Sequence, residues 1–288
     1  MEDRPMKEFQ AGRARKSLGQ NFLVSEGAIR KIVEALRPGE GLPIFEIGPG
    51  KGALTIPLAE KGARIAAFEI DRDLAALLRE ACAGWPQVDI VEADIREVDF
   101  DAEAGKRGWR RYRVAGNIPY LLTSTILLKL PFSAGCDGAV IMVQKEVGER
   151  ILASPGERNC GILSVFMQAY LGISEVAKVK AGSFMPPPKV DSVVLEFRPG
   201  RKDGAPAKPG EFLAFVKKGF SQRRKKLLNV FRSGDGPGRH VGVPGGREAA
   251  EKAFAAARVD AGKRPEELGL DEWFRLFEQL GRPGDIKE

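Results

Sequence analysis

A glycine-rich turn between an apolar run and a helix-forming segment limits the possible folds of this chain more than any other feature. Residues 44–47 have the composition of a buried strand, and residues 53–60 have that of a helix. Between them, Gly48, Gly50 and Gly52 allow a tight turn and would let backbone N–H groups approach a ligand closely. A strand, a glycine turn and a helix in this order are typical of nucleotide-binding α/β sheets.

The spacing of the glycines leaves three interpretations open. It fits the looser dinucleotide-binding fingerprint, the loop of class I S-adenosylmethionine-dependent methyltransferases, or a purely structural turn. A phosphate-binding Walker loop is excluded because no Lys-Ser or Lys-Thr pair follows the glycines. Glu69 ends the next predicted strand about 20 residues later, where its carboxylate could accept hydrogen bonds from both ribose hydroxyls of a nucleoside. Asp94 follows the strand at 88–91 and is placed to accept one from an adenine amino group.

Strands alternate with helices as far as residue 199, which predicts an α/β fold with a mostly parallel sheet covered on both faces. The last two strands, near 175–180 and 193–197, have no helix between them and should form an antiparallel edge. Residues 200–210 are rich in Gly, Pro and charge and predict a linker, and the predicted segments of 211–288 are all helical. We therefore expect one domain over residues 1–199 and a second, helical domain beyond the linker.

Charge and composition exclude several classes of protein. The net charge is +7 and is concentrated in residues 4–16 and 211–232, so a polyanion such as nucleic acid is the expected partner. Three widely spaced cysteines and a single histidine argue against a disulfide framework, a metal site and serine–histidine catalysis. No apolar run has membrane-spanning length and the N-terminus lacks a signal peptide, so we expect a cytoplasmic protein without a membrane partner.

The segment 117–120, at the end of a predicted strand, distinguishes between these interpretations. The lone pair of a nucleobase amino group is delocalised into the ring, so this nitrogen is a poor nucleophile. The side-chain oxygen of Asn117 and the carbonyl of Ile118 could accept from its N–H groups and hold it toward a methyl donor. Pro119 would fix the turn, and Tyr120 offers a ring on which the base can stack. A helix-capping Asn followed by an ordinary proline turn is the structural alternative.

The order and spacing of these motifs together resemble the ribosomal RNA small-subunit adenine dimethyltransferase family of the KsgA type. This family is a branch of the class I methyltransferases, which also includes the erythromycin-resistance methyltransferases. The resemblance covers most of the chain and rests on LGQNFL at 18–23, EIGPG at 46–50, EID at 69–71, Asp94, NIPY at 117–120, QKE at 144–146, FMPPPKVDS at 184–192 and FSQRRK at 220–225. It implies a Rossmann-like methyltransferase domain with a seven-stranded sheet, and S-adenosyl-L-methionine as the methyl donor.

The resemblance also assigns roles to individual residues. It implies that Tyr120 and Phe184 enclose the target adenine, and that the donor is contacted by Asn21, Leu23, Gly48, Glu69, Asp94 and Asn117. The helical domain would bind RNA through a basic segment that grips phosphates, consisting of Lys217, Lys218, Arg223, Arg224, Lys225 and Lys226. Because the sulfonium of the donor is already an activated electrophile, we expect the protein to align its substrates rather than to supply acid–base chemistry.

The expected reaction is dimethylation of N6 of two adjacent adenines in a hairpin loop near the 3′ end of small-subunit (16S) ribosomal RNA. We expect a monomer that acts on a pre-assembled small subunit and contributes to its biogenesis. Three alternatives remain open. An erythromycin-resistance enzyme would methylate large-subunit RNA, although FMPPPKVDS and the long helical tail favour the small-subunit type. A nicotinamide oxidoreductase would use the glycine turn and Glu69 alone, and a non-catalytic assembly factor would bind the donor without turnover.

Overall fold

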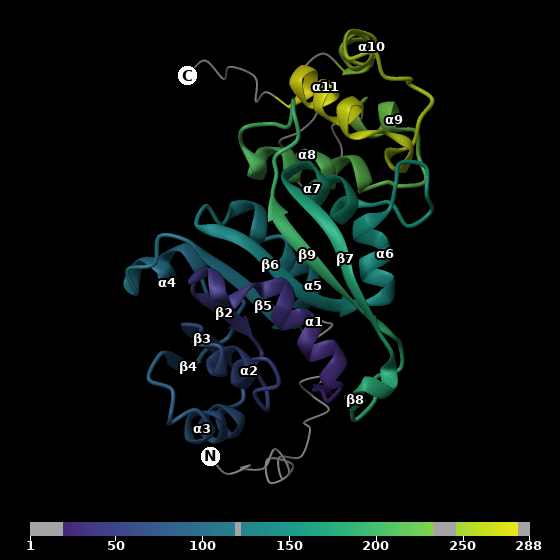
Figure 1. Ribbon diagram of the computed structural model, residues 1–288. Helices are drawn as coiled ribbons and strands as arrows, with labels where there is room; N and C mark the ends of the chain where they lie inside the picture. The colour runs from purple at the N-terminus through teal and green to yellow at the C-terminus, as the bar shows by residue number, and fades with distance from the viewer. Residues whose placement is uncertain (1–19, 119–121, 233–245, 282–288) are drawn as a thin grey trace. The chain divides into compact units, whose positions relative to one another are not determined.

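The computed structural model of the chain describes residues 20–118, 122–232 and 246–281 (Figure 1). These residues form two compact units, one built around a β-sheet and one mostly helical. Tyr120 and the basic residues of 4–16, which the sequence analysis singled out, lie outside the described residues. The described part of the chain contains no helix long and apolar enough to cross a membrane.

The first unit is organised around a seven-stranded sheet with the strand order β4-β3-β2-β5-β6-β9-β7. The strands from β4 to β6 pair in parallel, whereas β9 runs antiparallel to β6. This arrangement confirms the predicted α/β fold with a mostly parallel sheet and an antiparallel edge. The strands are β2 (Ile44–Ile47), β3 (Ile65–Glu69), β4 (Val88–Glu92), β5 (Tyr112–Asn117), β6 (Cys136–Gln144), β7 (Leu171–Val179) and β9 (Ser192–Pro199).

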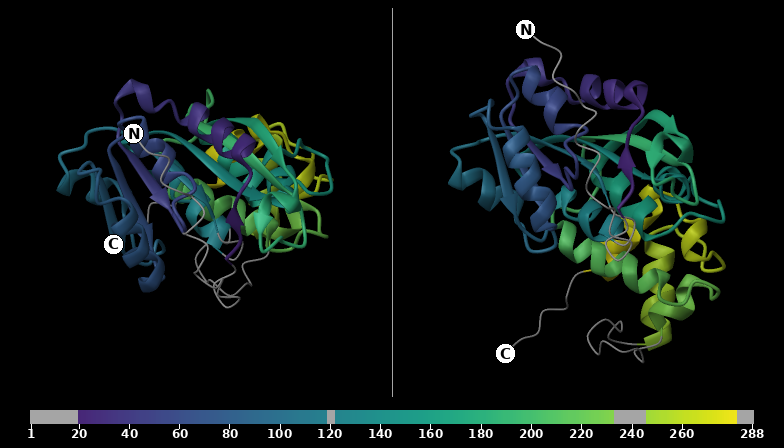
Figure 2. Two further views of the ribbon diagram at one scale, coloured as in Figure 1. Left: turned by 60° about the horizontal axis from the view of Figure 1, so that its bottom comes forward. Right: turned by 90° about the horizontal axis from the view of Figure 1, so that it is seen from below.

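Helices cover both faces of this sheet (Figure 2). Successive strand residues point to opposite sides, so neighbours in β2 enter different cores. Ile44 joins an aliphatic core with side chains of α1, α2 and α3. Phe45 lies in an aromatic cluster on the other face, with its ring centroid 5.8 Å from that of Phe100 in α4. The helices of this unit are α1 (Glu26–Leu36), α2 (Thr55–Glu60), α3 (Arg72–Ala81), α4 (Phe100–Lys106), α5 (Thr123–Leu127) and the first half of α6 (Lys145–Leu152).

A separate two-stranded ribbon joins the N-terminal segment to the proline-rich loop. Its strands, β1 (Phe22–Leu23) and β8 (Phe184–Met185), are antiparallel, with Leu23 opposite Phe184 and Phe22 opposite Met185. Leu23 and Phe184 belong to the aliphatic core, where Phe184 is 4% exposed. Met185 is 63% exposed, because strand alternation turns it to the other side.

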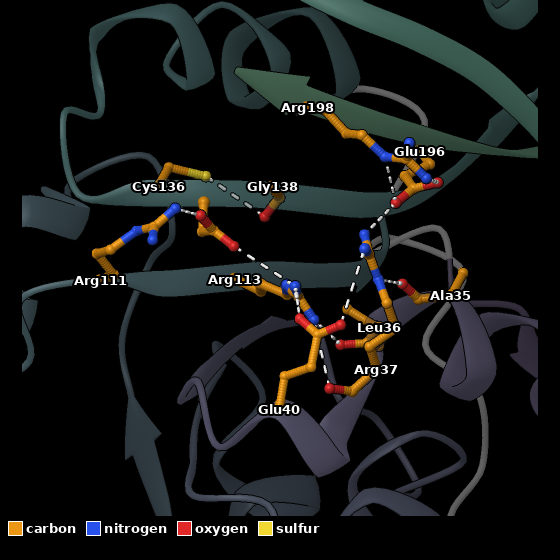
Figure 3. Close-up of polar contacts among 11 residues, drawn as sticks. Ala35, Leu36, Arg37, Glu40, Arg111, Arg113, Cys136, Gly138, Glu196 and Arg198 are labelled. Atoms are coloured by element: carbon orange, nitrogen blue, oxygen red, sulfur yellow. Dashed lines mark hydrogen bonds and ion pairs between the residues drawn. The ribbon is translucent and has the colours of Figure 1, made fainter. Parts of the chain in front are cut away.

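A polar network fixes the amino ends of the central strands (Figure 3). Arg113, the second residue of β5, is buried, and its guanidinium donates to the carboxylates of Glu40 and Asp137. Arg37, directly after α1, forms an ion pair with Glu196 of β9 at 2.6 Å. Since a strand rises by about 3.3 Å per residue, this network lies roughly 13 Å from the carboxyl end of β5. It therefore stabilises the end of the sheet that is remote from the expected ligand site.

The second unit is a group of helices with an aromatic core. Phe215 of α8 stacks on Phe231 of α9 with a centroid distance of 4.7 Å, and it meets the ring of Trp273 in α11 edge-on at 6.0 Å. Its helices include α7 (Ile162–Tyr170), α8 (Pro209–Phe220), α9 (Leu227–Arg232), α10 (Gly246–Ala256) and α11 (Leu270–Leu280). The predicted helical character of the C-terminal part is confirmed.

The two units divide the chain at more than one position. Glu149–Gly172 groups with the chain from Gly200 onward, and Ile173–Pro199 completes the first unit. The reason is that α7 packs against α8, although α7 precedes the last two strands in the sequence. A single boundary near residue 199 therefore does not describe the division, because the chain crosses between the units three times.

The segment 200–210, predicted as a linker, is a packed part of the second unit. Ala205 is buried, and the carbonyl of Pro206 accepts a hydrogen bond from the hydroxyl of Tyr170 at 2.9 Å. The Gly, Pro and charge content of a segment predicts its intrinsic flexibility, but it carries no information about contacts with a distant tyrosine. The composition therefore predicts a linker between two domains, whereas the segment packs within the second unit.

Candidate active site

A cavity opens at the carboxyl ends of three neighbouring parallel strands, β3, β2 and β5, where ligands bind sheets of this kind. Its walls come from the segment that leads into β1, the glycine turn and the ends of β3 and β5. They consist of Gln20, Asn21, Phe22, Leu23, Glu46, Gly48, Pro49, Gly50, Lys51, Ala53, Leu54, Glu69, Ile70, Leu74, Asn117 and Ile118. The structure thus brings together Asn21, Leu23, Gly48, Glu69 and Asn117, which were predicted to contact a methyl donor.

The glycine turn adopts a backbone conformation that requires glycine. Gly48, Gly50 and Gly52 have φ angles of 62°, 54° and 78°, in the left-handed region that other residues rarely adopt. A Cβ on Gly50 would lie 3.2 Å from the ring of Phe22, and one on Gly52 would lie 2.7 Å from Leu78 of α3. The turn is therefore held closely between β1 and α3 and forms one wall of the cavity.

The N–H groups of these glycines are already bonded within the protein. Gly48 donates to the carbonyl of Phe68 at 3.0 Å, and Gly52 donates to the carbonyl of Pro49 at 2.8 Å. Gly50 donates to the carboxylate of Glu69 at 3.0 Å. The expectation that glycine N–H groups face the ligand is therefore wrong for these three. A pyrophosphate-binding loop must offer such groups to the ligand, so the dinucleotide interpretation loses its physical basis.

Glu69 ends β3 and is held by two backbone groups. Its carboxylate accepts hydrogen bonds from the N–H of Gly50 and the N–H of Asp71, each at 3.0 Å. Burial raises the pKa of Glu69, although these hydrogen bonds oppose the shift. A carboxylate oxygen accepts more than one hydrogen bond, so both oxygens can still bind the two hydroxyls of a ribose. Ile70 and Leu74 line the cavity beside Glu69, which suits the apolar faces of an adenosine moiety.

Glu46 lines the cavity, although the sequence motifs did not predict a role for it. It lies within β2, is 2% exposed and accepts a hydrogen bond from the hydroxyl of Thr55 at 2.7 Å. Burial raises the pKa of Glu46 to about 7; the Thr55 hydrogen bond opposes this shift and the charge of Glu69 adds to it. An acidic residue inside an otherwise apolar strand was the available signal, since burial of a charge is costly.

Asn117 lies at the end of β5 with its amide group fixed. Its Nδ2 donates to the carbonyl of Asn21 at 3.0 Å, so Oδ1 points away from that bond and can accept from a substrate N–H. Ile118, whose carbonyl was predicted to act together with this oxygen, also lines the cavity. The hydrogen bond connects the N-terminal motif with the segment at the end of β5, two stretches that sequence spacing alone does not join.

Two of the predicted contacts, Asp94 and Phe184, are not among the lining residues of the cavity. Asp94 accepts from the backbone N–H of Arg96 at 2.9 Å and forms an ion pair with its guanidinium at 2.5 Å. These bonds to Arg96 lower the pKa of Asp94. Phe184 is 4% exposed and packs in the aliphatic core with Leu23. The roles of Asp94, Phe184 and Tyr120 stay predictions.

Five of the six predicted RNA-binding residues are exposed on the second unit. Lys217 and Lys218 lie in the last turn of α8, and the other four occupy the turn between α8 and α9. Lys218 is half-buried, with its ammonium 5.7 Å from the centroid of the Phe231 ring. Arg223 also supports the unit, because its guanidinium donates to the carbonyl of Arg158. The remaining charges face solvent and are suited to phosphate contacts.

Comparisons with known proteins agree with this geometry. Residues 11–256 match the model of the family described as ribosomal RNA adenine dimethylase. The chain is 39% identical over 270 residues to ribosomal RNA small subunit methyltransferase A of Geobacter sulfurreducens, covering 93% of this chain and 95% of the relative. It is 41% identical over 272 residues to the protein of that name from Acidobacterium capsulatum, covering 94% and 92%.

Solved structures show the same fold. A dimethyladenosine transferase from Plasmodium falciparum has a TM-score of 0.75 and 24% identity, with 91% of this chain and 98% of the other covered. The 23S rRNA methyltransferase ErmE has a TM-score of 0.65 and 28% identity, with 90% and 99% covered. The similarity extends over nearly the whole length of each protein and therefore includes the helical C-terminal part.

Proposed function

This chain belongs to the ribosomal RNA adenine dimethylase family, whose members use S-adenosyl-L-methionine as methyl donor, and from this premise we propose its substrate. It dimethylates N6 of two adjacent adenines in a hairpin loop near the 3′ end of small-subunit ribosomal RNA. The observation that carries the proposal is the position of Asn117 and Glu69 in one cavity, with the Asn117 amide held by the carbonyl of Asn21. A nucleoside bound to Glu69 and an amine bound to Asn117 would meet there.

The residues of this chain act by alignment. When bound, S-adenosylmethionine would supply a methyl group on a sulfonium, which needs no activation by the protein. The C–S bond would break as the N6–C bond forms, S-adenosylhomocysteine would leave, and N6 would lose one proton to solvent. Glu69 binds the ribose hydroxyls of the donor, while Asn21, Leu23 and Gly48 form the wall around it. Oδ1 of Asn117 and the carbonyl of Ile118 accept from the N6 hydrogens, which directs the nitrogen lone pair toward the donor and offsets the charge that develops. A pocket that performs two transfers must also admit the monomethylated amine.

Two of the assigned contacts, those of Asp94 and Phe184, need side chains to move. Asp94 would bind the donor adenine after releasing the guanidinium of Arg96, an exchange of one charged partner for a neutral one. Phe184 would enclose the target adenine together with Tyr120 after leaving its place beside Leu23. The energy of stacking on the extruded base would offset the loss of that packing.

The partner is small-subunit ribosomal RNA, presented within a pre-assembled small subunit in the cytoplasm. The exposed residues Lys217, Arg224, Lys225 and Lys226 bind phosphates and supply affinity without reading sequence. The folded particle therefore has to supply the choice of adenines, and the protein acts as a monomer that takes part in subunit biogenesis. Relatives of about 40% identity carry the small-subunit name, which makes large-subunit RNA the second candidate substrate.

The test is a methyl-transfer assay with three substrates. The protein and S-adenosylmethionine are incubated separately with unmethylated small subunits, naked small-subunit RNA and large-subunit RNA, and the modified nucleosides are identified by mass spectrometry. We expect dimethyladenosine on the small-subunit particle and little on naked RNA. Product on large-subunit RNA would assign the chain to the resistance type. Donor binding without product on any substrate would favour a non-catalytic assembly factor.

A further inference from the structure

Lys51 is a cation at the wall of the donor cavity. It lies in the glycine turn, is half-buried, and holds its ammonium 4.9 Å from the centroid of the Phe22 ring, which also lines the cavity. An ammonium over an aromatic face is weakly stabilised by the ring but keeps its capacity to donate hydrogen bonds. Burial lowers the pKa of Lys51, which indicates that the charge has lost part of its hydration. A bound anion would restore what hydration no longer supplies.

No carboxylate of the described residues takes this role. Glu46 and Glu69 line the same cavity, but they accept hydrogen bonds from Thr55 and from the N–H of Gly50. Lys51 forms no ion pair within the described part of the chain, and no charged neighbour contributes to its pKa shift. Its ammonium therefore remains available to a ligand.

An anion in this cavity finds no second cation among the described lining residues. Lys51 is the one basic side chain among the described lining residues. The N–H groups of Gly48, Gly50 and Gly52 donate within the protein and cannot also bind an anion at full strength. A carboxylate that enters beside the glycine turn is thus directed to the ammonium of Lys51.

The methyl donor carries such a carboxylate at the end of its methionine moiety. We propose that Lys51 binds the donor carboxylate and makes the enzyme select donors that carry this group. The inference rests on the proposed function, since it takes S-adenosylmethionine as the ligand. With the ribose on Glu69 and the carboxylate on Lys51, the donor is held at two points, and the sulfonium between them is positioned toward Asn117. Lys51 would thus contribute to donor binding and to the choice between donors with and without a carboxylate.

The experiment compares two donors by isothermal titration calorimetry in the absence of RNA. S-adenosylmethionine and its decarboxylated form differ by the carboxylate alone. We expect the wild-type protein to bind the decarboxylated form at least about tenfold more weakly, as the loss of a charged hydrogen bond predicts. Lys51→Met, which keeps an unbranched stem over Phe22, should lose about tenfold in affinity for S-adenosylmethionine and none for the decarboxylated form. Lys51→Arg should recover most of the discrimination.

Lys61→Met is the matched control, because Lys61 is exposed at the end of α2 and does not line the cavity. The proposal would be overturned if Lys51→Met bound each donor as tightly as the wild-type protein does. It would also be overturned if the variant lost the same affinity for both donors. A normal donor affinity combined with weaker binding of small-subunit RNA would overturn it too, and would assign the ammonium to an RNA phosphate. Failure of the wild-type protein to bind either donor is a different result, because it would refute the proposed function itself.

Discussion

Replacement of Glu46 by Gln should remove a loss of stability that the wild-type protein undergoes as the pH rises. The pKa of Glu46 is about 7 in the folded state and 4.5 without the fold, so the folded state holds its proton more tightly. Between pH 4.5 and pH 7, Glu46 is ionised in the unfolded chain but still protonated in the folded protein. The free energy of unfolding of the wild-type protein therefore falls as the pH rises through this range. The full difference corresponds to about 3 kcal/mol, of which about 2.5 kcal/mol accrues between pH 5 and pH 8. Gln cannot ionise, yet its carbonyl oxygen can still accept from Thr55.

The assay is urea unfolding at pH 5, 6, 7 and 8 without donor, followed by tryptophan fluorescence. The difference in unfolding free energy between Glu46→Gln and wild type should shift by about 2.5 kcal/mol in favour of the variant across this range. Glu60→Gln, an exposed substitution at the end of α2, is the control and should show a constant difference. A constant difference for Glu46→Gln as well would refute the argument, because it would mean that Glu46 ionises as easily in the fold as outside it.

Four further variants test the site and its support. Asn117→Ala should lower the methylation rate by about 100-fold, and a rate within a few-fold of wild type would contradict its role. Gly50→Ala should cost about 2 kcal/mol in urea unfolding because of its positive φ, and should weaken donor binding in calorimetry. Arg113→Met should cost about 3 kcal/mol of stability but leave donor affinity unchanged, since the network lies roughly 13 Å from the cavity. Reversal of Lys225 and Lys226 to Glu should weaken RNA binding in filter assays and flatten its salt dependence, whereas a salt slope equal to wild type would exclude phosphate contacts by both.

The sheet and the edge at which the site lies could be predicted from the sequence. Apolar runs of four or five residues alternate with helical segments, and this pattern leaves few arrangements other than a parallel sheet. The carboxyl ends of parallel strands share one edge, so the residues that end β2, β3 and β5 had to meet. Glu69 and Asn117 were predictable because each ends a strand.

Other features depend on contacts that local pattern does not encode. The pairing of β1 with β8 turns Phe184 inward, and its strand of two residues is too short to show alternation in the sequence. The ion pair between Asp94 and Arg96 depends on how the chain bends between these two residues. Their spacing in the sequence does not show whether the carboxylate of Asp94 is paired or free. The hydrogen bonds from Gly48 to Phe68 and from Gly50 to Glu69 likewise depend on the register between β2 and β3.

The pairing of β1 with β8 also determines when the site can be completed during synthesis. The chain leaves the ribosome from its N-terminus, so Phe22 emerges early and its partner Met185 emerges only after most of the sheet has been translated. Until then the wall of the cavity that carries Asn21 has no partner strand. A nascent chain would thus stay unable to hold the donor fully until the segment that contains β8 has left the ribosome and paired with β1.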